Sequence, residues 1–285
     1  MDGNGNGGNG NGEQENQGQE GPTELGWALV LGSSSGFGAA TAAALAEEAG
    51  LNICGVHLRR PGDPDAYEET KARIEAAGRK YLPFNMNAAN PDRRRDALDK
   101  MAEAMEGSGF RVLLHSLAFG SLKPYITNEP DDALTQAQMD MTLDVMAHSL
   151  VYWTQDLVSR NLLGRGSRIF AMTSAGSQRV IPSYGAVSAA KAALESHIRQ
   201  LAVELAPRGI TANAIRAGVT DTPALRRIPG NDLLIEGALA RNPSGRLTRP
   251  TDVAGFIALL ARPGSGADWV TGNVLGVDGG EDIVG

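Results

Sequence analysis

Short apolar runs alternate with longer amphipathic stretches from Leu25 almost to the end of the chain. The runs have the length and aliphatic composition of strands, and they cover 27–31, 51–58, 81–84, 110–115, 168–172, 210–215 and 274–277. The stretches between them have helical character over 39–49, 65–77, 92–105, 133–161, 184–206 and 252–261. Strands that are separated by single helices connect through right-handed crossovers, so this pattern predicts one parallel sheet.

The fold class follows from this alternation. We predict an α/β protein with a doubly wound parallel sheet of the Rossmann type and helices on both faces, formed as a single domain by residues 23–285. With 285 residues, 42% of them apolar, the chain can bury a substantial core. Residues 1–22 are almost entirely Gly, Asn, Gln and Glu. Because such a segment buries too little apolar surface to offset its ordering entropy, we expect a disordered tail.

Charge, cysteine and histidine usage exclude several classes of function. The net charge of -7, without a basic stripe, argues against nucleic acid as a partner. Cys54 is the only cysteine, which excludes an internal disulfide and favours a reducing compartment. No metal site is predicted, because the histidines lack metal-ligand spacing: His57, His115, His148 and His197. The tail is unlike a signal peptide and no run reaches transmembrane length, so we expect a cytoplasmic protein with no membrane partner.

Ligands of parallel α/β sheets bind beyond the carboxyl ends of the strands. The loops that follow residues 31, 58, 84, 117, 173 and 215 should therefore form the binding crevice. Residues 218–244 make an unusually long connection, rich in Pro and Gly, with short helical pieces. A segment of this kind predicts a lid over the substrate, at about 218–244.

A glycine-rich turn directly follows the first predicted strand, with the sequence Gly32-Ser33-Ser34-Ser35-Gly36-Phe37-Gly38. Glycines permit a tight turn and a close backbone approach, and the next helix presents its free N–H groups to a phosphate. The spacing is neither GxGxxG nor a Walker A loop. A plain strand–helix turn would also contain glycines, but the position after the first strand favours phosphate binding.

The second predicted strand ends in two arginines, Arg59 and Arg60, and the first carboxylate after it is Asp63. A carboxylate at this point would hold a ribose 2′-hydroxyl, whereas guanidinium groups can clamp a 2′-phosphate. The arginines therefore favour NADPH, with NADH still possible, although two solvated surface arginines are the alternative. Asn87, after the third strand, is placed to hold the adenine.

Tyr184 and Lys191 lie seven residues apart in a predicted helix, so they share one face. A hydroxyl beside a fixed cation can donate a hydrogen bond or a proton to a carbonyl oxygen that gains negative charge. Taken alone, the pair is better explained as an ordinary tyrosine and lysine on a surface helix. The context of the rest of the chain decides between the two interpretations.

The glycine turn, the Tyr184/Lys191 pair and the ending Val277-Asp278-Gly279-Gly280 together resemble the short-chain dehydrogenase/reductase superfamily over about residues 25–280. Ordinary members have Tyr-x3-Lys, whereas the Tyr-x6-Lys of this chain is similar to the enoyl-acyl-carrier-protein reductases. The segments 115–120 and 144–150 also resemble that group. Ser174 stands where many of these enzymes have a second tyrosine. An NADPH-using branch also has a serine at this position, together with the ordinary glycine turn, and this chain resembles that branch.

The resemblance implies a role for individual residues. Tyr184 would hydrogen-bond the carbonyl oxygen of the substrate, and Lys191 would bind the ribose of the nicotinamide half of the cofactor. Ser174 would contact substrate or a water, unless it only caps the following turn. The cofactor trough would be lined, after the fourth and sixth strands, by Ser116, Ala118, Gly218, Val219 and Thr222.

The implied reaction is the reduction of the 2,3 double bond of an enoyl thioester, carried by acyl carrier protein or coenzyme A, in fatty acid or related synthesis. The spacing from Ser174 to Lys191 is that of ordinary members, so Val187 takes the usual tyrosine position. Tyr184 is displaced from it by one helical turn, about 4.5 Å along the axis. This shift makes room for a carbonyl oxygen one conjugated bond from the carbon that accepts hydride.

Two other functions remain open at this point. The first is an ordinary carbonyl or alcohol reductase, such as a 3-oxoacyl-acyl-carrier-protein reductase. The second is a non-catalytic nucleotide-binding sensor, against which the intact Tyr184 and Lys191 argue.

Apolar lid residues could shelter an acyl chain or be ordinary core: Leu225, Ile228, Leu233, Leu234 and Leu239. Lid arginines could attract an acidic carrier protein or be scattered surface charge: Arg226, Arg227 and Arg241. The resemblance also implies a homotetramer with interfaces on helices 133–161 and 184–206.

Overall fold

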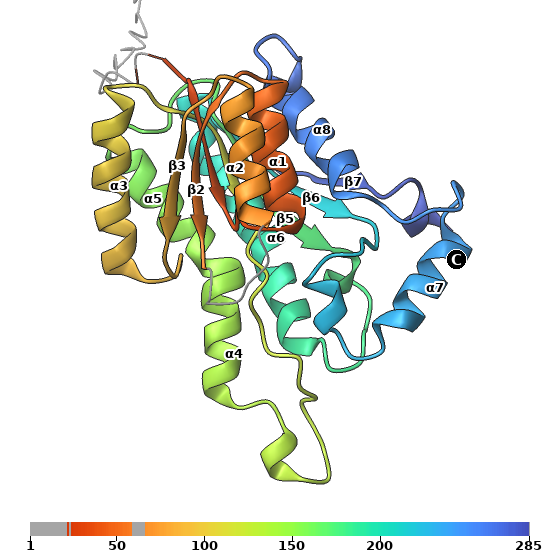
Figure 1. Ribbon diagram of the computed structural model, residues 1–285. Helices are drawn as coiled ribbons and strands as arrows, with labels where there is room; N and C mark the ends of the chain where they lie inside the picture. The colour runs from red at the N-terminus through yellow and green to blue at the C-terminus, as the bar shows by residue number, and fades with distance from the viewer. Residues whose placement is uncertain (1–21, 23, 59–65, 285) are drawn as a thin grey trace, which may run out of the picture.

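The computed structural model describes Pro22, residues 24–58 and residues 66–284. It confirms one seven-stranded parallel sheet with the strand order β3-β2-β1-β4-β5-β6-β7 (Figure 1). The direction of winding reverses between β1 and β4, which is the switch point of a doubly wound sheet. The strands are β1 (Trp27–Leu31), β2 (Asn52–His57), β3 (Tyr81–Asn85), β4 (Phe110–His115), β5 (Arg168–Ser174), β6 (Thr211–Ala217) and β7 (Val274–Val277).

Helices cover both faces of the sheet (Figure 1). On one face lie α1 (Gly36–Glu47), α2 (Ala66–Ala76) and α8 (Pro250–Ala261), and on the other α3 (Pro91–Met105), α5 (Ser149–Ser159) and α6 (Gly185–Leu205). Strand β1 feeds both cores, because Leu29 and Leu31 join the α3/α5/α6 side while Ala28 and Val30 join the other. Burial on both faces explains why this strand is a continuous apolar run.

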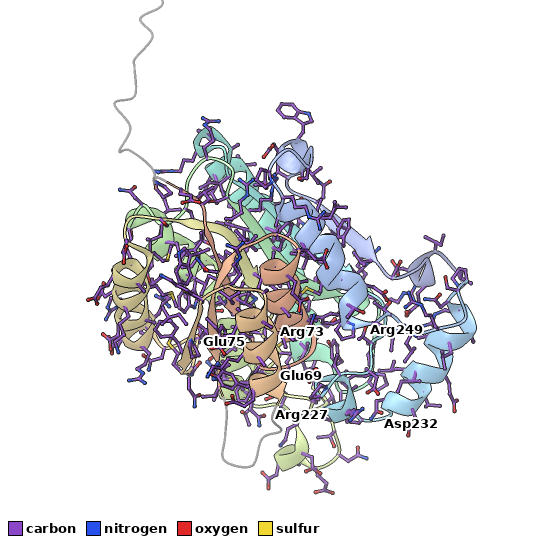
Figure 2. The ribbon with its side chains drawn as sticks, turned by 45° about the horizontal axis from the view of Figure 1, so that its top comes forward. Glu69, Arg73, Glu75, Arg227, Asp232 and Arg249 are labelled. Carbon is purple, nitrogen blue, oxygen red and sulfur yellow. The ribbon has the colours of Figure 1, made fainter. Side chains whose placement is uncertain are left out.

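The outer face of α2 is charged, with Glu69, Arg73 and Glu75 visible along it in Figure 2. Arg73 reaches back to α1, where its Nε and Nη2 donate to the two carboxylate oxygens of Glu47 at 2.9 and 2.7 Å. This exposed, bidentate pair joins the two helices that cover the β1–β2 half of the sheet.

The long helix predicted over 133–161 runs from Gln136 to Ser159, with a π-helical turn that the sequence did not predict. The chain forms α4 (Gln136–Leu143), a π-helical turn η2 (Asp144–His148) and then α5. The first helix starts at Gln136 because Thr135 and Gln138 form a reciprocal capping box. In Figure 1, α4 and the loop before it extend well beyond the sheet. The turn η2 lies between this arm and the packed helix α5.

The other boundaries decide which residues reach the crevice. Helix α1 begins at Gly36, three residues before the predicted start, so the glycine turn leads directly into it. Strands β5 and β6 run on to Ser174 and Ala217. The predicted lid contains η5 (Leu225–Arg227) and α7 (Asn231–Arg241) as its short helical pieces.

Some of the predictions fall outside the described residues, among them Arg59, Arg60 and all of the tail except Pro22. Within the described ranges, no helix is both long and apolar enough to cross a membrane. Cys54 is buried in β2, and that burial raises the pKa of its thiol.

Candidate active site

Tyr184 stands at the entrance to α6, beside the carboxyl end of β5. The preceding Ser183 has a left-handed backbone with φ of 60°, and Tyr184 is the N-cap residue of the helix. Its ring covers Gly176, where a Cβ atom would lie 2.7 Å from the ring and 3.2 Å from Ser174 Oγ. The turn after β5 therefore brings the predicted Ser174 and Tyr184 together, with Gly176 making room for the phenol.

The two hydroxyl groups influence each other without a close hydrogen bond. Burial raises the pKa of Tyr184, and the nearby Ser174 hydroxyl partly opposes that rise. The Ser174 Oγ is itself buried, and among the described residues it has no partner in good hydrogen-bond geometry. A buried, unpartnered hydroxyl beside a protonated phenol can receive a polar group of a bound substrate.

Lys191 lies on the same helix and is buried. Its Nζ donates to the backbone oxygen of Met172 in β5 at 2.6 Å. Burial lowers the pKa of Lys191 to about 8, although the charge of Glu195 one turn further along acts in the opposite direction. Glu195 accepts a hydrogen bond from Thr173 Oγ1 at 2.6 Å, so Lys191 and Glu195 are both tied to β5.

His115, at the end of β4, has a structural role and does not face the binding crevice. It is fully buried and its Nε2 lies 2.9 Å from Ser149 Oγ, which in turn donates to the backbone oxygen of Val145. Burial, together with the charge of Lys191, lowers the pKa of His115 to about 3, so the ring is neutral. The histidine therefore fixes the π-helical turn η2 against the sheet.

Val187 occupies the position where ordinary members of the resembled superfamily have their tyrosine. Its side chain is buried against Gly120, where a Cβ atom would lie 2.8 Å from Val187 Cγ2. A second phenol, that of Tyr125, lies over Gly185, next to Tyr184, and is 49% exposed. The sequence offered no signal for Tyr125, because it stands in an irregular loop without periodicity.

The glycine turn between β1 and α1 packs backbone against backbone. Gly32 has φ of 95°, and a Cβ atom there would lie 2.3 Å from the backbone oxygen of Ser116. At Gly38 a Cβ atom would lie only 2.0 Å from the backbone oxygen of Gly32. Ser35 is the N-cap of α1 but its side chain makes no capping hydrogen bond, so it leaves the N–H groups of the first turn to another acceptor.

Across the crevice, the glycine turn meets the loop after β6. A Cβ atom at Gly36 would lie 3.6 Å from the methyl group of Thr222. The structure thus places most of the predicted cofactor residues together, including those on three different strand ends. Such a backbone cradle at a helix N-terminus fits the pyrophosphate of a dinucleotide.

Ser33 lies elsewhere than predicted, because its side chain turns into the sheet. It is buried, its Oγ is 3.4 Å from both the backbone oxygen of Val56 and the hydroxyl of Tyr81, and its N–H donates to Val56. Only Ser34 and Ser35 have accessible hydroxyls at the turn. Asn87 is exposed and accepts a hydrogen bond from the N–H of Ala89, and Ala118 is exposed as well.

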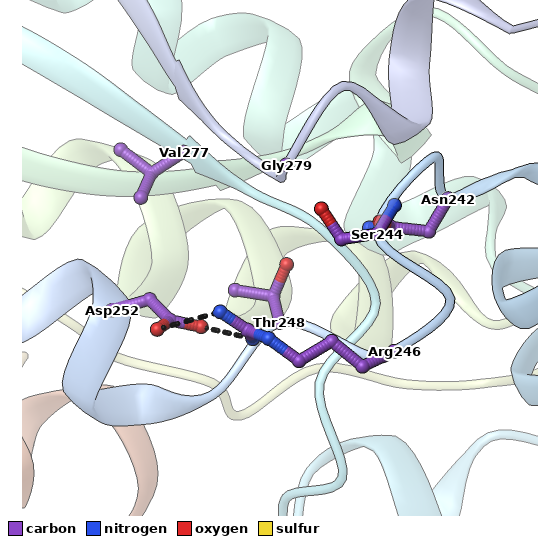
Figure 3. A pocket seen from close by; sticks show the side chains of 7 residues that line it. All are labelled: Asn242, Ser244, Arg246, Thr248, Asp252, Val277 and Gly279. Atoms are coloured by element: carbon purple, nitrogen blue, oxygen red, sulfur yellow. Dashed lines mark hydrogen bonds and ion pairs between the residues drawn. The ribbon is translucent and has the colours of Figure 1, made fainter.

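The turn after β6 is held by residues that the sequence did not single out. The N–H of Val219 donates to Glu281 Oε2 at 2.9 Å, and a Cβ atom at Gly218 would lie 2.4 Å from Thr248 Oγ1. Thr248 also lines a pocket of about 150 Å³, and Tyr184 is not one of its lining residues (Figure 3). It is lined by Asn242, Ser244, Arg246, Thr248, Asp252, Val277 and Gly279.

Known proteins share this fold and these sequence features. The family described as Enoyl-(Acyl carrier protein) reductase matches residues 32–281. A 1-cyclohexenylcarbonyl-CoA reductase of Streptomyces collinus is 29% identical over 90% of this chain and 86% of its own. An enoyl-[acyl-carrier-protein] reductase [NADH] of Aquifex aeolicus is 32% identical over 66% of this chain and 67% of its own.

Solved structures of similar fold include the same kinds of protein as the sequence relatives. The crystal structure of an enoyl-[acyl-carrier-protein] reductase (NADH) from Aquifex aeolicus has a TM-score of 0.77 at 25% identity, covering 92% of this chain and 98% of that one. A short chain dehydrogenase from Burkholderia cenocepacia, in complex with NADP, has a TM-score of 0.74 at 30% identity, covering 90% and 98%. Fold and site therefore define a nicotinamide-dependent oxidoreductase of the short-chain dehydrogenase/reductase type. Within that superfamily, the chain belongs to the Enoyl-(Acyl carrier protein) reductase family.

Proposed function

We propose that the protein reduces the 2,3 double bond of enoyl thioesters with NADPH. The observation that carries this proposal is the position of Tyr184, whose ring lies over Gly176 beside Ser174 at the mouth of α6. The buried Val187 fills the position one turn further along the helix, so of these two positions of α6 only the displaced one carries a phenol. A carbonyl oxygen that receives charge by conjugation, rather than hydride itself, suits this displacement.

The chain's own residues fit the cofactor. The proposed pyrophosphate site is the turn 32–38, through the first N–H groups of α1, with Ser116, Ala118 and the segment 218–222 along the trough. Asn87 is proposed to contact the adenine. When bound, NADPH supplies the hydride that adds to the β-carbon of the substrate. The preference for NADPH rests on Arg59 and Arg60, and tighter binding of NADH would contradict it.

Two residues would act on the substrate, and a third would hold the cofactor beside them. Tyr184 stays protonated, because burial raises the pKa of its phenol, and it donates a hydrogen bond to the thioester oxygen as negative charge develops there. Ser174 offers its unpartnered hydroxyl to the same end of the substrate. Lys191, fixed to β5 through Met172, would bind the nicotinamide ribose and place positive potential near the phenol.

The lid supports an acyl substrate only in part. Leu225 and Ile228 are buried, whereas Leu233 and Leu239 are exposed. Among the lid arginines, Arg226 is bound bidentately to Asp221 at 2.8 and 2.9 Å, and Arg241 pairs with Glu281 at 3.6 Å. Arg227 is exposed at η5 (Figure 2), and we assign to it the attraction of an acidic carrier protein.

The proposal extends to the setting of the enzyme: a cytoplasmic homotetramer in fatty acid or related synthesis, with α4–α5 and α6 at the subunit interfaces. Light scattering on the purified protein measures the assembly. A monomer in solution would contradict that part of the proposal and would leave the reaction unaffected.

The test of the reaction is a paired assay. NADPH oxidation is followed with crotonyl and acetoacetyl thioesters for the wild type, Tyr184→Phe and, as a matched control, Tyr152→Phe on α5. The wild type should consume crotonyl thioester, and Tyr184→Phe should lose about 10²–10³-fold in kcat, the cost of removing one oxyanion donor. Tyr152→Phe should keep full activity. Consumption of the acetoacetyl substrate alone would establish a carbonyl reductase instead, a function that the Burkholderia dehydrogenase makes the main alternative.

A further inference from the structure

Two acidic residues follow Gly279 and Gly280, and both are tied to the walls of the crevice. Glu281 is 6% exposed and bonds to the turn after β6. Asp282 pairs with Arg216 of β6 and with Arg179 of the loop before Tyr184, both at 2.8 Å. We call residues 279–282 the acidic clasp. In Figure 1 this end of the chain lies beside α7.

The clasp is hydrogen-bonded to the backbone N–H of Val219, a residue that the proposed function assigns to the cofactor site. The N–H of Val219 donates to Glu281 Oε2 at 2.9 Å, and the same carboxylate oxygen lies 2.8 Å from where a Cβ atom of Gly218 would stand. A backbone N–H can donate a strong hydrogen bond to one carboxylate or to one amide oxygen of a ligand. The Val219 N–H cannot serve Glu281 and the cofactor fully at the same time.

The surroundings allow the clasp to move. Gly279 and Gly280 both have left-handed backbones, with φ of 64° and 87°, and together form a two-glycine hinge directly before Glu281. The 150 Å³ pocket of Figure 3 borders Gly279 and Asn242, and Asn242 Nδ2 donates to the backbone oxygen of Asp278 at 2.9 Å. The hinge therefore lies between this pocket and Asp278, whose carboxylate accepts hydrogen bonds from the N–H groups of Gly280 and Asp282 at 3.0 and 3.2 Å.

The lid is coupled to the same carboxylate. Arg241, at the end of α7, lies 3.6 Å from Glu281 Oε1 and keeps an unpartnered, buried Nε. One side chain, Glu281, thus connects the lid helix to the turn after β6. Any ligand that displaces this carboxylate from Val219 also changes its contact with the lid.

We propose that Glu281 is an internal competitor of the nicotinamide cofactor: its carboxylate holds the Val219 N–H in the free protein, and cofactor binding displaces the acidic clasp about the Gly279–Gly280 hinge. This inference rests on the proposed assignment of Val219 to the cofactor site. Glu281 is a positioning residue in this scheme, since it takes no part in the reduction.

The first test is cofactor affinity without substrate, measured by the fluorescence of bound NADPH. Glu281→Ala should bind NADPH about tenfold more tightly, because a charge-assisted hydrogen bond no longer has to be broken. Glu281→Gln keeps an oxygen acceptor and should gain only about threefold. Glu48→Ala is the matched control, because it also removes one acid, paired with Arg262 away from the clasp, and it should not tighten binding. Equal or weaker NADPH binding by a folded Glu281→Ala would overturn the proposal.

The second test uses the wild-type chain and so does not depend on how a variant folds. Hydrogen exchange is measured with and without NADPH. Binding should slow exchange in the turn 32–38 and speed it in 277–284. Slower exchange in both segments overturns the clasp and leaves the cofactor site intact. No change in either segment overturns the cofactor assignment as well as the clasp, and in both outcomes enoyl turnover is measured separately.

Discussion

Two turns face each other across the crevice, and they differ in what occupies their backbone groups. The turn between β1 and α1 closes by backbone packing alone, and the N–H groups at the start of α1 receive no side-chain cap. The turn after β6 is filled by side chains, with Glu281 on the Val219 N–H and Thr248 against Gly218. The first turn is therefore preorganised for an anion, whereas in our proposal the second exchanges an internal partner for a ligand.

The difference also concerns how each turn tolerates change. An atom added at Gly38 meets the backbone of Gly32, which cannot move without opening the turn. An atom added at Gly218 meets mainly the side chains of Thr248 and Glu281, which can rotate. A glycine thus packs against rigid backbone in the first turn and against side chains that can rotate in the second.

The largest effect is expected at the rigid turn. Gly38→Ala places a methyl group 2.0 Å from the Gly32 oxygen, and we expect a loss of about 3 kcal/mol in the free energy of unfolding together with the loss of NADPH binding. Urea denaturation and NADPH fluorescence measure the two. Gly255→Ala in α8 is the control, since a Cβ atom there meets nothing within 4 Å, and it should gain up to about 1 kcal/mol. A fully stable Gly38→Ala that binds NADPH normally would contradict the rigid description.

The next largest effect is expected at Lys191, which belongs to neither turn, in the pH dependence of the free energy of unfolding. Burial lowers the pKa of Lys191 to about 8 in the folded protein, from an ordinary 10.5. Between these values the unfolded chain keeps a proton that the folded protein has lost, so folding is favoured increasingly as the pH rises. Relative to Lys191→Met, the wild type should gain up to about 2–3 kcal/mol in the free energy of unfolding from pH 8 to 10.5. Parallel stability curves for the two proteins would show that Lys191 is not held in this way.

A smaller effect is expected at the adjustable turn. Gly218→Ala should cost about 1 kcal/mol in the free energy of unfolding, because Thr248 Oγ1 lies 2.4 Å from the added atom and has to move. Removing that oxygen in the double variant with Thr248→Ala should recover part of the loss. Thermal or urea unfolding of the three variants completes the cycle. Strict additivity, or a loss as large as that of Gly38→Ala, would remove the contrast between the turns.

The sequence was sufficient for everything that depends on local pattern. Period and spacing predicted the sheet, most helices and the glycine turn, and the resemblance to the reductases implied the joint position of Ser174 and Tyr184. They did not predict the π-helical turn η2, next to which Ser149 contacts the distant His115. The contact of Glu281 with Val219 joins residues far apart in the chain, and no local signal announces it. Ser33 was assigned to the crevice because a motif fixes the order of residues and not the direction of each side chain.

The central claim, that the β-carbon of an enoyl thioester accepts hydride while Tyr184 holds the thioester oxygen, is tested most directly by isotope transfer. The protein is incubated with NADPH deuterated at C4 on either face and an equimolar mixture of crotonyl and acetoacetyl thioesters. Mass spectrometry then locates the label. We predict a butyryl thioester with deuterium at C3. Deuterium found only at the carbinol carbon of a 3-hydroxybutyryl thioester would contradict the account.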